Sequence, residues 1–471
     1  MKQLFTCIIW VCIIGLASAQ SFIENIGSTN SKIKILEAQE LLIAGEMDGL
    51  IIGVNTNYKR LNFCMQAIAI DENSNIVRNL DIPGTKNDSP LAANLYDGKI
   101  YILSKRFETF STSYTYMRYV IDAETMTLIG EPTEVLEITS KSTSANYSWN
   151  ASSKDGSLTA IINISTTPKG EKYEATEILF DEEMNIEWQR DYPIYSLSSM
   201  FVTDDGEIVT IGRSKGKGPH TLYFSVLNEN DIQYLSKQTK LYVYDTYIVS
   251  YKDSRILVMG LGTTTDSKND KEINYFGMSV NVETEESEIH YKGFDNTDNN
   301  IFFDTKIGKS AKPLTINQIS LNKCIATEYG AVGTIQNYLY KSSIGILVFA
   351  LDNHGNIIWN RDIRFNMKRS NGEVRSGFTI AAKGSNVYLT MSEDPKSPKQ
   401  YTIEEPSRKT NTSMGAKALS TYKIDAEGNI SKSMESLSKP AILDRRLRKV
   451  GDKHIGFLTN QSGAAIIKFN Y

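Results

Sequence analysis

The stretch Phe349-Ala-Leu-Asp-Asn-His-Gly-Asn-Ile-Ile-Trp359 decides the fold, because it has the pattern of a strand, a tight turn and a second strand. Apolar and β-branched residues flank a cluster of Asp, Asn and Gly, and those turn residues tolerate the left-handed backbone that a short hairpin requires. Weaker copies recur along the whole chain of 471 residues. A recurring hairpin predicts a β-repeat protein.

Four copies keep the Asp at the same place, and two more diverged copies cover residues 225–234 and 280–289. The four are Ile68-Ala-Ile-Asp-Glu-Asn-Ser-Asn-Ile-Val77, Tyr119-Val-Ile-Asp-Ala-Glu-Thr-Met-Thr-Leu128, Ile178-Leu-Phe-Asp-Glu-Glu-Met-Asn-Ile-Glu-Trp188 and Tyr422-Lys-Ile-Asp-Ala-Glu-Gly-Asn-Ile430. Repeated carboxylates at identical turn positions predict hairpin capping, since Asp side chains hydrogen-bond to the backbone of their own turn.

A second turn signal alternates with the first. It consists of Asp-Gly at residues 48, 97, 155 and 205, with weaker versions at residues 253–257, 321–325, 384–388 and 451–455. Each unit of about 50 residues therefore contains strand A, a turn, strand B, a loop, strand C, the Asp turn and strand D. Four strands per unit describe a blade of an all-β β-propeller.

The two signals predict eight blades, because there are eight A-to-B turns. The final residues, 464–471, form a strand C with no strand D after it. We expect residues 22–36, with Lys32-Ile-Lys-Ile-Leu36, to supply the missing strand and so remove an exposed edge. Seven blades is the alternative, since the units between residues 253 and 384 are the least regular.

The first 19 residues have the pattern of an export signal, with one Lys, an apolar stretch and Ala17-Ser18-Ala19 at the end. We expect a signal peptide at 1–19 and one propeller domain at 20–471, in a periplasmic or secreted protein. No later stretch has the roughly 20 consecutive apolar residues of a membrane helix. The net charge of −4 is small, so nothing indicates a nucleic-acid partner.

The sequence contains no pattern that specifies a metal or a cofactor. Only Cys64 and Cys324 remain after the signal, and we expect two separate buried thiols. The four His lie in different units without metal-ligand spacing. Oxygen ligands that suit calcium occur at Asp295-Asn-Thr-Asp-Asn-Asn300 and Asp304, although the spacing of a calcium loop is absent.

The unit that ends in Trp359 resembles the repeat of the pyrroloquinoline-quinone-like (WD40-like) β-propellers, a group with both dehydrogenases and non-enzymatic scaffolds. The resemblance covers most of the chain, and Trp188 and Trp359 match the Trp of the repeat. It implies that these Trp pack between neighbouring blades. The dehydrogenases of the group use adjacent cysteines, which this chain lacks, so the resemblance favours a non-catalytic member of exported type, as in Gram-negative bacteria.

In a propeller, the loops joining D to A and B to C gather on one face. Tyr and Arg side chains there offer broad contacts and directional hydrogen bonds. The candidate ligand-binding residues are Arg106, Tyr147, Arg213, Tyr247 and Arg445.

The leading hypothesis is an exported, non-enzymatic propeller that binds a protein, peptide or glycan through this face, without inserting into a membrane. One alternative is an extracellular carbohydrate-active hydrolase or lyase with acids from several blades. Another is an outer-membrane β-barrel, because the C-terminal residues alternate apolar and polar and end in an aromatic residue.

Overall fold

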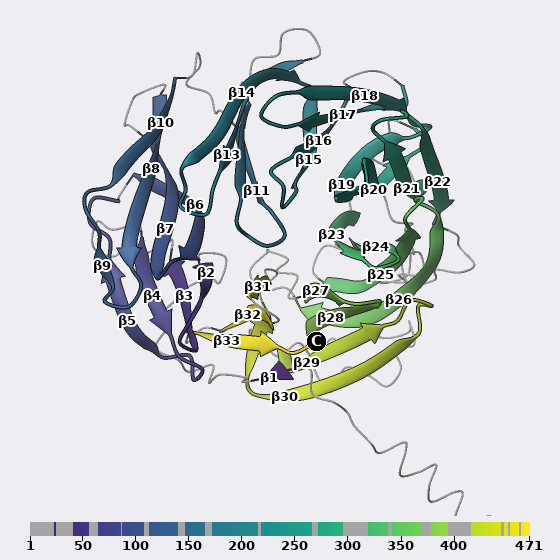
Figure 1. Ribbon diagram of the computed structural model, residues 1–471. Coiled ribbons are helices and arrows are strands. Elements are labelled where there is room, and N and C mark those ends of the chain that lie inside the picture. Colours follow the sequence, from purple (N-terminus) through teal and green to yellow (C-terminus); the bar gives the residue numbers. More distant parts are fainter. Residues whose placement is uncertain are drawn as a thin grey trace, which may run out of the picture.

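The strands of the chain form seven separate sheets that follow one another around a ring in chain order (Figure 1). The computed structural model describes residues 23–24, 41–55, 65–85, 87–107, 113–139, 147–164, 172–214, 218–265, 272–294, 319–337, 342–368, 378–393, 416–443, 447–450, 453–460 and 463–471. Each sheet is antiparallel, and its first strand lies nearest the centre of the ring. This arrangement confirms an all-β β-propeller.

The first four sheets are consecutive along the chain, and their strands are paired in sequence order except that β10 and the short β9 both pair with β8. The first contains β2 (Leu41–Met47), β3 (Leu50–Asn55), β4 (Gln66–Ile70) and β5 (Ile76–Asp81). The second contains β6 (Asp88–Tyr96), β7 (Lys99–Phe107), β8 (Ser113–Asp122), β9 (Thr127–Leu128) and β10 (Thr133–Thr139). The third contains β11 (Tyr147–Ser152), β12 (Thr159–Ile164), β13 (Tyr173–Phe180) and β14 (Ile186–Ile194). The fourth contains β15 (Ser196–Val202), β16 (Ile208–Arg213), β17 (Thr221–Leu227) and β18 (Ile232–Gln238).

The remaining three sheets complete the ring. The fifth contains β19 (Tyr242–Lys252), β20 (Arg255–Thr263), β21 (Ile273–Asn281) and β22 (Ser287–Gly293). The sixth contains β23 (Ile319–Thr327), β24 (Gly330–Asn337), β25 (Ser342–Asp352) and β26 (Ile357–Lys368). The seventh contains β27 (Phe378–Lys383), β28 (Asn386–Glu393), β29 (Ala416–Ile424) and β30 (Ile430–Leu443), and it continues through β31 (Arg448–Val450), β32 (Lys453–Asn460), β33 (Gly463–Phe469) and β1 (Ile23–Glu24).

The expected count of eight blades is wrong, because the structure has seven. β30 is 14 residues long and pairs with β29 over most of its length. Its last residues, Ile442 and Leu443, pair with β32, so the strands after β30 extend the seventh sheet instead of starting another. The N-terminal strand does pair with β33, through Ile23 and Glu24. Residues 32–36, which we expected to form that strand, lie outside the described part.

The predicted turns explain the regular hairpins. Asp48 and Gly49 both have positive φ, as do Asp97 and Gly98, which matches the turn type whose twist suits a two-residue hairpin. In the Asp turn, one carboxylate oxygen accepts the backbone N–H and the other accepts the side-chain amide of the Asn four residues later. The distances are 2.9 and 2.8 Å for Asp352 and Asn356. The turns at residues 71, 181 and 425 repeat both contacts, so the predicted capping role is confirmed.

One predicted turn is misplaced. Residues 321–325 lie inside β23, and the chain turns only after Thr327. β23 contains a bulge between Leu321 and Lys323, which disturbs its alternating pattern.

The hydrophobic core is divided among the interfaces between consecutive sheets. The second and third sheets share a cluster that includes Tyr116 and Phe180. The sixth and seventh sheets share a cluster that includes Val348 and Ala350. The last strands lie between β27–β30 and the first sheet. Phe469 packs against residues of β27–β30, while Ile466 packs against the first sheet. The ring therefore closes by packing on both sides of β33.

Other expectations have mixed outcomes. The strands belong to separate sheets, so the alternative of one closed sheet is wrong. Cys324 is a free thiol that packs against buried residues, whereas Cys64 and the Asp295 stretch lie outside the described part. Among the described residues, no helix has the length and apolar character needed to cross a membrane.

Candidate binding site at the end of β7

The four predicted ligand-binding residues that the structure describes do not form one site. Arg106 is the penultimate residue of β7 and Tyr147 is the first residue of β11, so both lie at the loop edge of neighbouring sheets. Arg213 and Tyr247 belong to the fourth and fifth sheets. Arg445 lies outside the described residues. The ends of β7 and β11 lie side by side, since the ammonium of Lys105 is 3.5 Å from the Ser148 hydroxyl.

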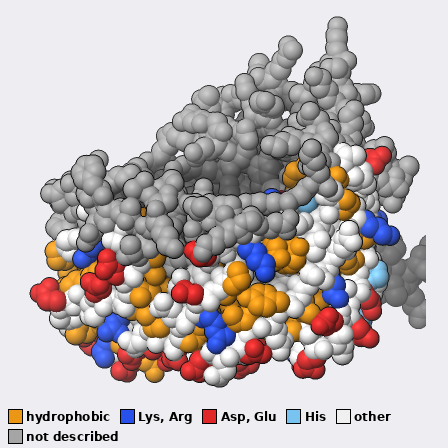
Figure 2. All heavy atoms as spheres, turned by 90° about the horizontal axis from the view of Figure 1, so that it is seen from above, with side chains coloured by type: hydrophobic (Ala, Val, Ile, Leu, Met, Phe, Trp, Pro, Cys, Tyr) orange, Lys and Arg blue, Asp and Glu red, His pale blue; other side chains and the backbone are white. Residues whose placement is uncertain are grey.

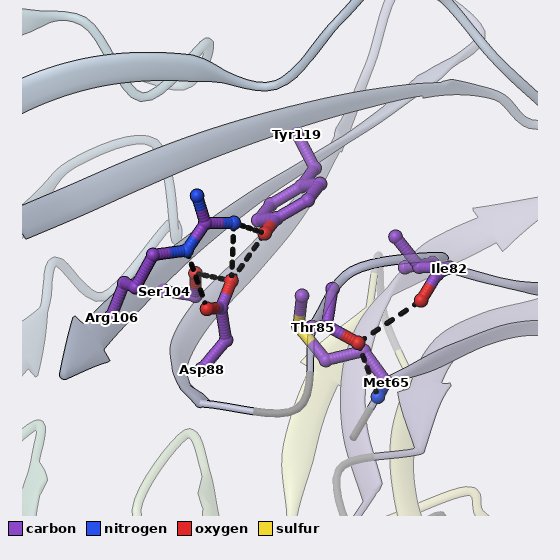
Figure 3. A network of polar contacts seen from close by, with 7 residues as sticks. All are labelled: Met65, Ile82, Thr85, Asp88, Ser104, Arg106 and Tyr119. Carbon is purple, nitrogen blue, oxygen red and sulfur yellow. Dashed lines mark hydrogen bonds and ion pairs between the residues drawn. The ribbon is translucent and has the colours of Figure 1, made fainter. Parts of the chain in front are cut away.

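A buried carboxylate orients Arg106. The guanidinium donates from Nε to one oxygen of Asp88 at 2.8 Å and from Nη2 to the other at 3.3 Å, and Nη2 also donates to the Tyr119 hydroxyl at 2.7 Å (Figure 3). Asp88 also accepts hydrogen bonds from the hydroxyls of Ser104 and Tyr119. Asp88 is thereby fully paired, which offsets the cost of burying its charge.

The sequence explains why these side chains meet. Asp88 and Arg106 are directly opposite each other in the β6–β7 ladder, and Ser104 lies on the same face as Arg106, two residues earlier. The turn before β6 is held by Thr85, whose hydroxyl donates to the Ile82 carbonyl and accepts the Met65 N–H (Figure 3). The hydrogen bond to Asp88 is the main cause that raises the pKa of Arg106, so this group stays charged.

Lys105 points to the opposite face of the second sheet, toward the third. Its ammonium lies 3.6 Å from the ring centre of Tyr114 and 5.3 Å from that of Phe107. It lies 3.5 Å from the Ser148 hydroxyl of β11. The residue is only 4% exposed, and no acidic side chain pairs with it within the described residues. Burial lowers the pKa of Lys105 from 10.5 to about 8.

Two tyrosines of β8 near Lys105 contact the third sheet. The hydroxyls of Tyr114 and Tyr116 both donate to Oδ1 of Asn163 in β12, at 2.7 and 2.6 Å. The two rings meet edge to face. These contacts join the second sheet to the third. The Phe107 ring, at the end of β7, is 50% exposed. We call Lys105, Arg106 and Phe107 the β7 end.

The β7 end combines positive charge with an aromatic ring. Two cations and an exposed aromatic ring are suited to recognising anionic or amphipathic ligands. Across the described residues, no three His, Cys, Asp or Glu side chains are arranged to hold a metal ion.

Arg213 has a structural role that the sequence did not reveal. Its Nη1 donates to the carbonyls of Val243 and Tyr244 in the next sheet, the latter at 3.1 Å. Tyr247 is 37% exposed on the first strand of the fifth sheet. Neither side chain contributes to the β7 end.

Further basic residues on the outer strands bind carbonyls of the turn between the third and fourth strands of the next sheet. Arg190 donates to Glu229, Lys237 to Glu285, and Arg361 to Gly428 and Glu427. In these three units the cation follows the first turn residue by nine positions. Aligning the repeats on that residue would have revealed this signal.

The outer wall is chemically mixed where it can be seen. Figure 2 shows hydrophobic side chains interspersed with Lys, Arg, Asp and Glu. Neither positive nor negative charge predominates on the visible wall. Tyr234 of β18 is an example of an exposed aromatic residue on the outermost strand, with 51% exposure. Isolated apolar side chains of this kind are normal on a protein surface.

The chain is remotely similar to several solved structures. No protein-family model matches the chain, and no curated protein matches its sequence. The β-propeller domain of the Trilobed protease from Pyrococcus furiosus is 12% identical, with 86% of this chain and 97% of that chain covered and a TM-score of 0.39. The WD40 domain of SCAP from fission yeast is 10% identical, with 94% and 96% covered and a TM-score of 0.42.

A third similar structure is prolyl oligopeptidase B from Galerina marginata, at 8% identity and a TM-score of 0.41. The similarity covers 89% of this chain but only 54% of that one, so this chain spans about half its length. Similarities this remote do not transfer a residue role or an activity. The function is therefore argued from the site itself.

Proposed function

We propose that this protein is an exported, non-enzymatic β-propeller that binds a protein, peptide or glycan through the β7 end. The observation that carries the proposal is the placement of Lys105, Arg106 and Phe107 at the loop edge of the second sheet. Arg106 itself is held by hydrogen bonds to Asp88, and Tyr114, next to Lys105, donates to Asn163. A rigid support under the partly exposed Arg106 and the exposed Phe107 lowers the entropy lost on binding.

Two parts of this proposal rest on the sequence. The export signal in residues 1–19 supports a periplasmic or secreted location, and the intact mass of the exported protein should correspond to a chain that begins at Gln20. The resemblance of the repeat to the pyrroloquinoline-quinone-like propellers, without adjacent cysteines, supports a non-catalytic role.

The test compares two aromatic residues with nearly equal exposure. Phe107 and Tyr234 are 50% and 51% exposed, but only Phe107 lies at the β7 end. We expect Phe107→Ala to weaken binding to a partner from a glycan array or an envelope-protein panel by about tenfold, the loss typical of an interface residue that matters. Tyr234→Ala serves as the control and should bind as the wild type does.

Equal binding by both variants would contradict the proposed site. The free energy of unfolding should be measured for both, so that a loss of binding by Phe107→Ala is separated from a loss of folding.

A further inference from the structure

Arg106 differs from Arg78, Arg190, Arg213 and Arg361 in its choice of partners. Arg78, Arg190 and Arg361 donate to turn carbonyls of the next sheet, and Arg213 donates to carbonyls of a neighbouring strand. These contacts hold sheets together. The partners of Arg106 are Asp88 and Tyr119, both in its own sheet. Its guanidinium therefore serves no interface between the sheets.

The hydrogen bonds of Arg106 leave one guanidinium nitrogen, Nη1, available as a donor. Nε and Nη2 are used, whereas Nη1 donates to no described residue and points away from Asp88 in Figure 3. The Arg106 side chain is 32% exposed, while that of Asp88 is completely buried. The carboxylate thus fixes the plane of the guanidinium and leaves Nη1 without a described partner, in a side chain that is partly exposed.

The surroundings favour a negatively charged ligand. Lys105 adds a second cation on the same strand end, and the two outnumber Asp88, the one acid in the described network. A guanidinium in a fixed orientation binds carboxylate and phosphate oxygens through charge-assisted hydrogen bonds. Less side-chain entropy is lost when the orientation exists before binding.

We propose that Nη1 of Arg106 is the anchor for an anionic group, a carboxylate or a phosphate or sulfate ester, on the ligand of the β7 end. This inference rests on the proposed function and names the chemistry of its ligand. Phe107 contacts the apolar part next to that group, and Lys105 contributes positive potential without contacting it.

The experiment is a calorimetric titration of the full protein with sodium sulfate and, separately, with sodium acetate, at constant ionic strength. The two arms distinguish tetrahedral esters from carboxylates. We expect saturable binding of at least one anion, with a dissociation constant on the order of 1 mM, as suits a single exposed charge contact. Arg106→Lys keeps a cation beside Asp88 but removes the planar guanidinium and its paired N–H donors. This variant should bind the anion about tenfold more weakly.

Arg190→Lys is the matched control, because its guanidinium donates to a backbone carbonyl of the next sheet. It should bind the anion as the wild type does. Equal anion binding by wild type and Arg106→Lys, or no saturable binding of either anion, would overturn the inference. Since Arg106→Lys retains the ion pair with Asp88, folding is expected, and circular dichroism verifies it.

The pH dependence provides a second readout. The groups facing Lys105 are Tyr114 and Tyr116 of β8, Ser148 of β11 and Asn163 of β12, and none is expected to change charge between pH 7 and 9. The pKa of Lys105 is about 8, so anion affinity should fall as pH rises through that value. Lys105→Met should remove this fall, and an unchanged profile would contradict the contribution of Lys105.

The anion inference and the proposed site can fail separately. If partner binding is lost in Phe107→Ala but unchanged in Arg106→Lys, the site stands and the anionic anchor is wrong. If neither variant affects partner binding, both are wrong.

Discussion

Glu177 is the most unusual single residue in the described part of the chain. It lies in β13 and its side chain is buried between the third and fourth sheets, near the Tyr192 hydroxyl. Neither of its oxygens has a direct hydrogen-bond partner among the described residues, and the same holds for that hydroxyl. Burial raises the pKa of Glu177 from 4.5 to about 8. The carboxyl is therefore neutral in the folded protein at neutral pH.

The sign of the effect on stability follows from linkage. In the unfolded chain, the pKa of Glu177 has its ordinary value of 4.5. The free energy of unfolding is therefore highest below pH 4.5 and falls as the pH rises toward 8. Over that range the loss is roughly 4 kcal/mol at most, since one pKa unit corresponds to about 1.4 kcal/mol. The interface between the third and fourth sheets is thus the one we expect alkaline conditions to weaken.

We predict that Glu177→Gln increases the free energy of unfolding at pH 8 and has little effect near pH 4.5, because the amide cannot ionise. Urea unfolding at both pH values measures this difference. Glu187→Gln, on the exposed face of β14, is the control and should show no comparable pH dependence. A Glu177→Gln variant with the same pH profile as wild type would contradict the ionisation of this residue as the cause.

At the scale of the elements, the Asp turn is both a hairpin and a contact between sheets. Trp359 of β26 donates from Nε1 to the Ala426 carbonyl at 2.7 Å, and Arg361 donates to Gly428 at 2.8 Å. Both acceptors belong to the Asp turn of the seventh sheet. A side chain on Gly428 would clash with Trp359, which explains a glycine at this position beyond its positive φ. The resemblance implied such packing for Trp359, and the structure confirms it.

Arg361→Met should lower the free energy of unfolding by about 1.5–3 kcal/mol, because it removes charge-assisted hydrogen bonds but keeps most of the aliphatic stem. Chemical denaturation provides the measurement. Lys252→Met is the matched control, since Lys252 is exposed at the end of β19. If the two variants lose equal stability, the contacts of Arg361 with the turn contribute nothing beyond its surface charge.

For the whole molecule, the last strands determine whether the ring closes. Tyr471 is buried, stacks at 4.6 Å between ring centres on Tyr388 of the seventh sheet, and lies 2.9 Å from the Thr390 hydroxyl. Phe469 also stacks with Tyr471, at 5.3 Å between ring centres. On the opposite face of the seam, the N–H of Ile466 donates to Ser74 of the first sheet. Residues from the two ends of the ring are thus joined through β33.

Tyr471→Ala should destabilise the protein by about 3–5 kcal/mol, as for other large aromatic residues removed from a core. Tyr471→Phe keeps the stacked ring and loses only the hydroxyl, so the expected cost is about 1 kcal/mol. Thermal unfolding of the two variants checks the order. Equal midpoints for Tyr471→Ala and wild type would show that the seam does not limit the stability of the ring.

Much of the fold could be read from the sequence because its signals are local. The Asp turns at residues 71, 181, 352 and 425 and the Asp-Gly turns each depend on a few consecutive residues, and all lie where expected. The binding face was only partly predictable. Arg106 was chosen for its residue type, but its neighbour Lys105 was missed because burial by Tyr114 is invisible along one strand.

The sequence by itself determined the hairpins, the four-stranded units and the capping role of each repeated Asp, because backbone turns are set by neighbouring residues. Tertiary structure decided the blade count, since β30 runs on to pair with β32 and merges two expected units into one sheet. It also decided that Asp88 orients Arg106 while Arg213 holds the next sheet. Those outcomes depend on which strands pack side by side, and long-range packing brings together residues that no local pattern connects.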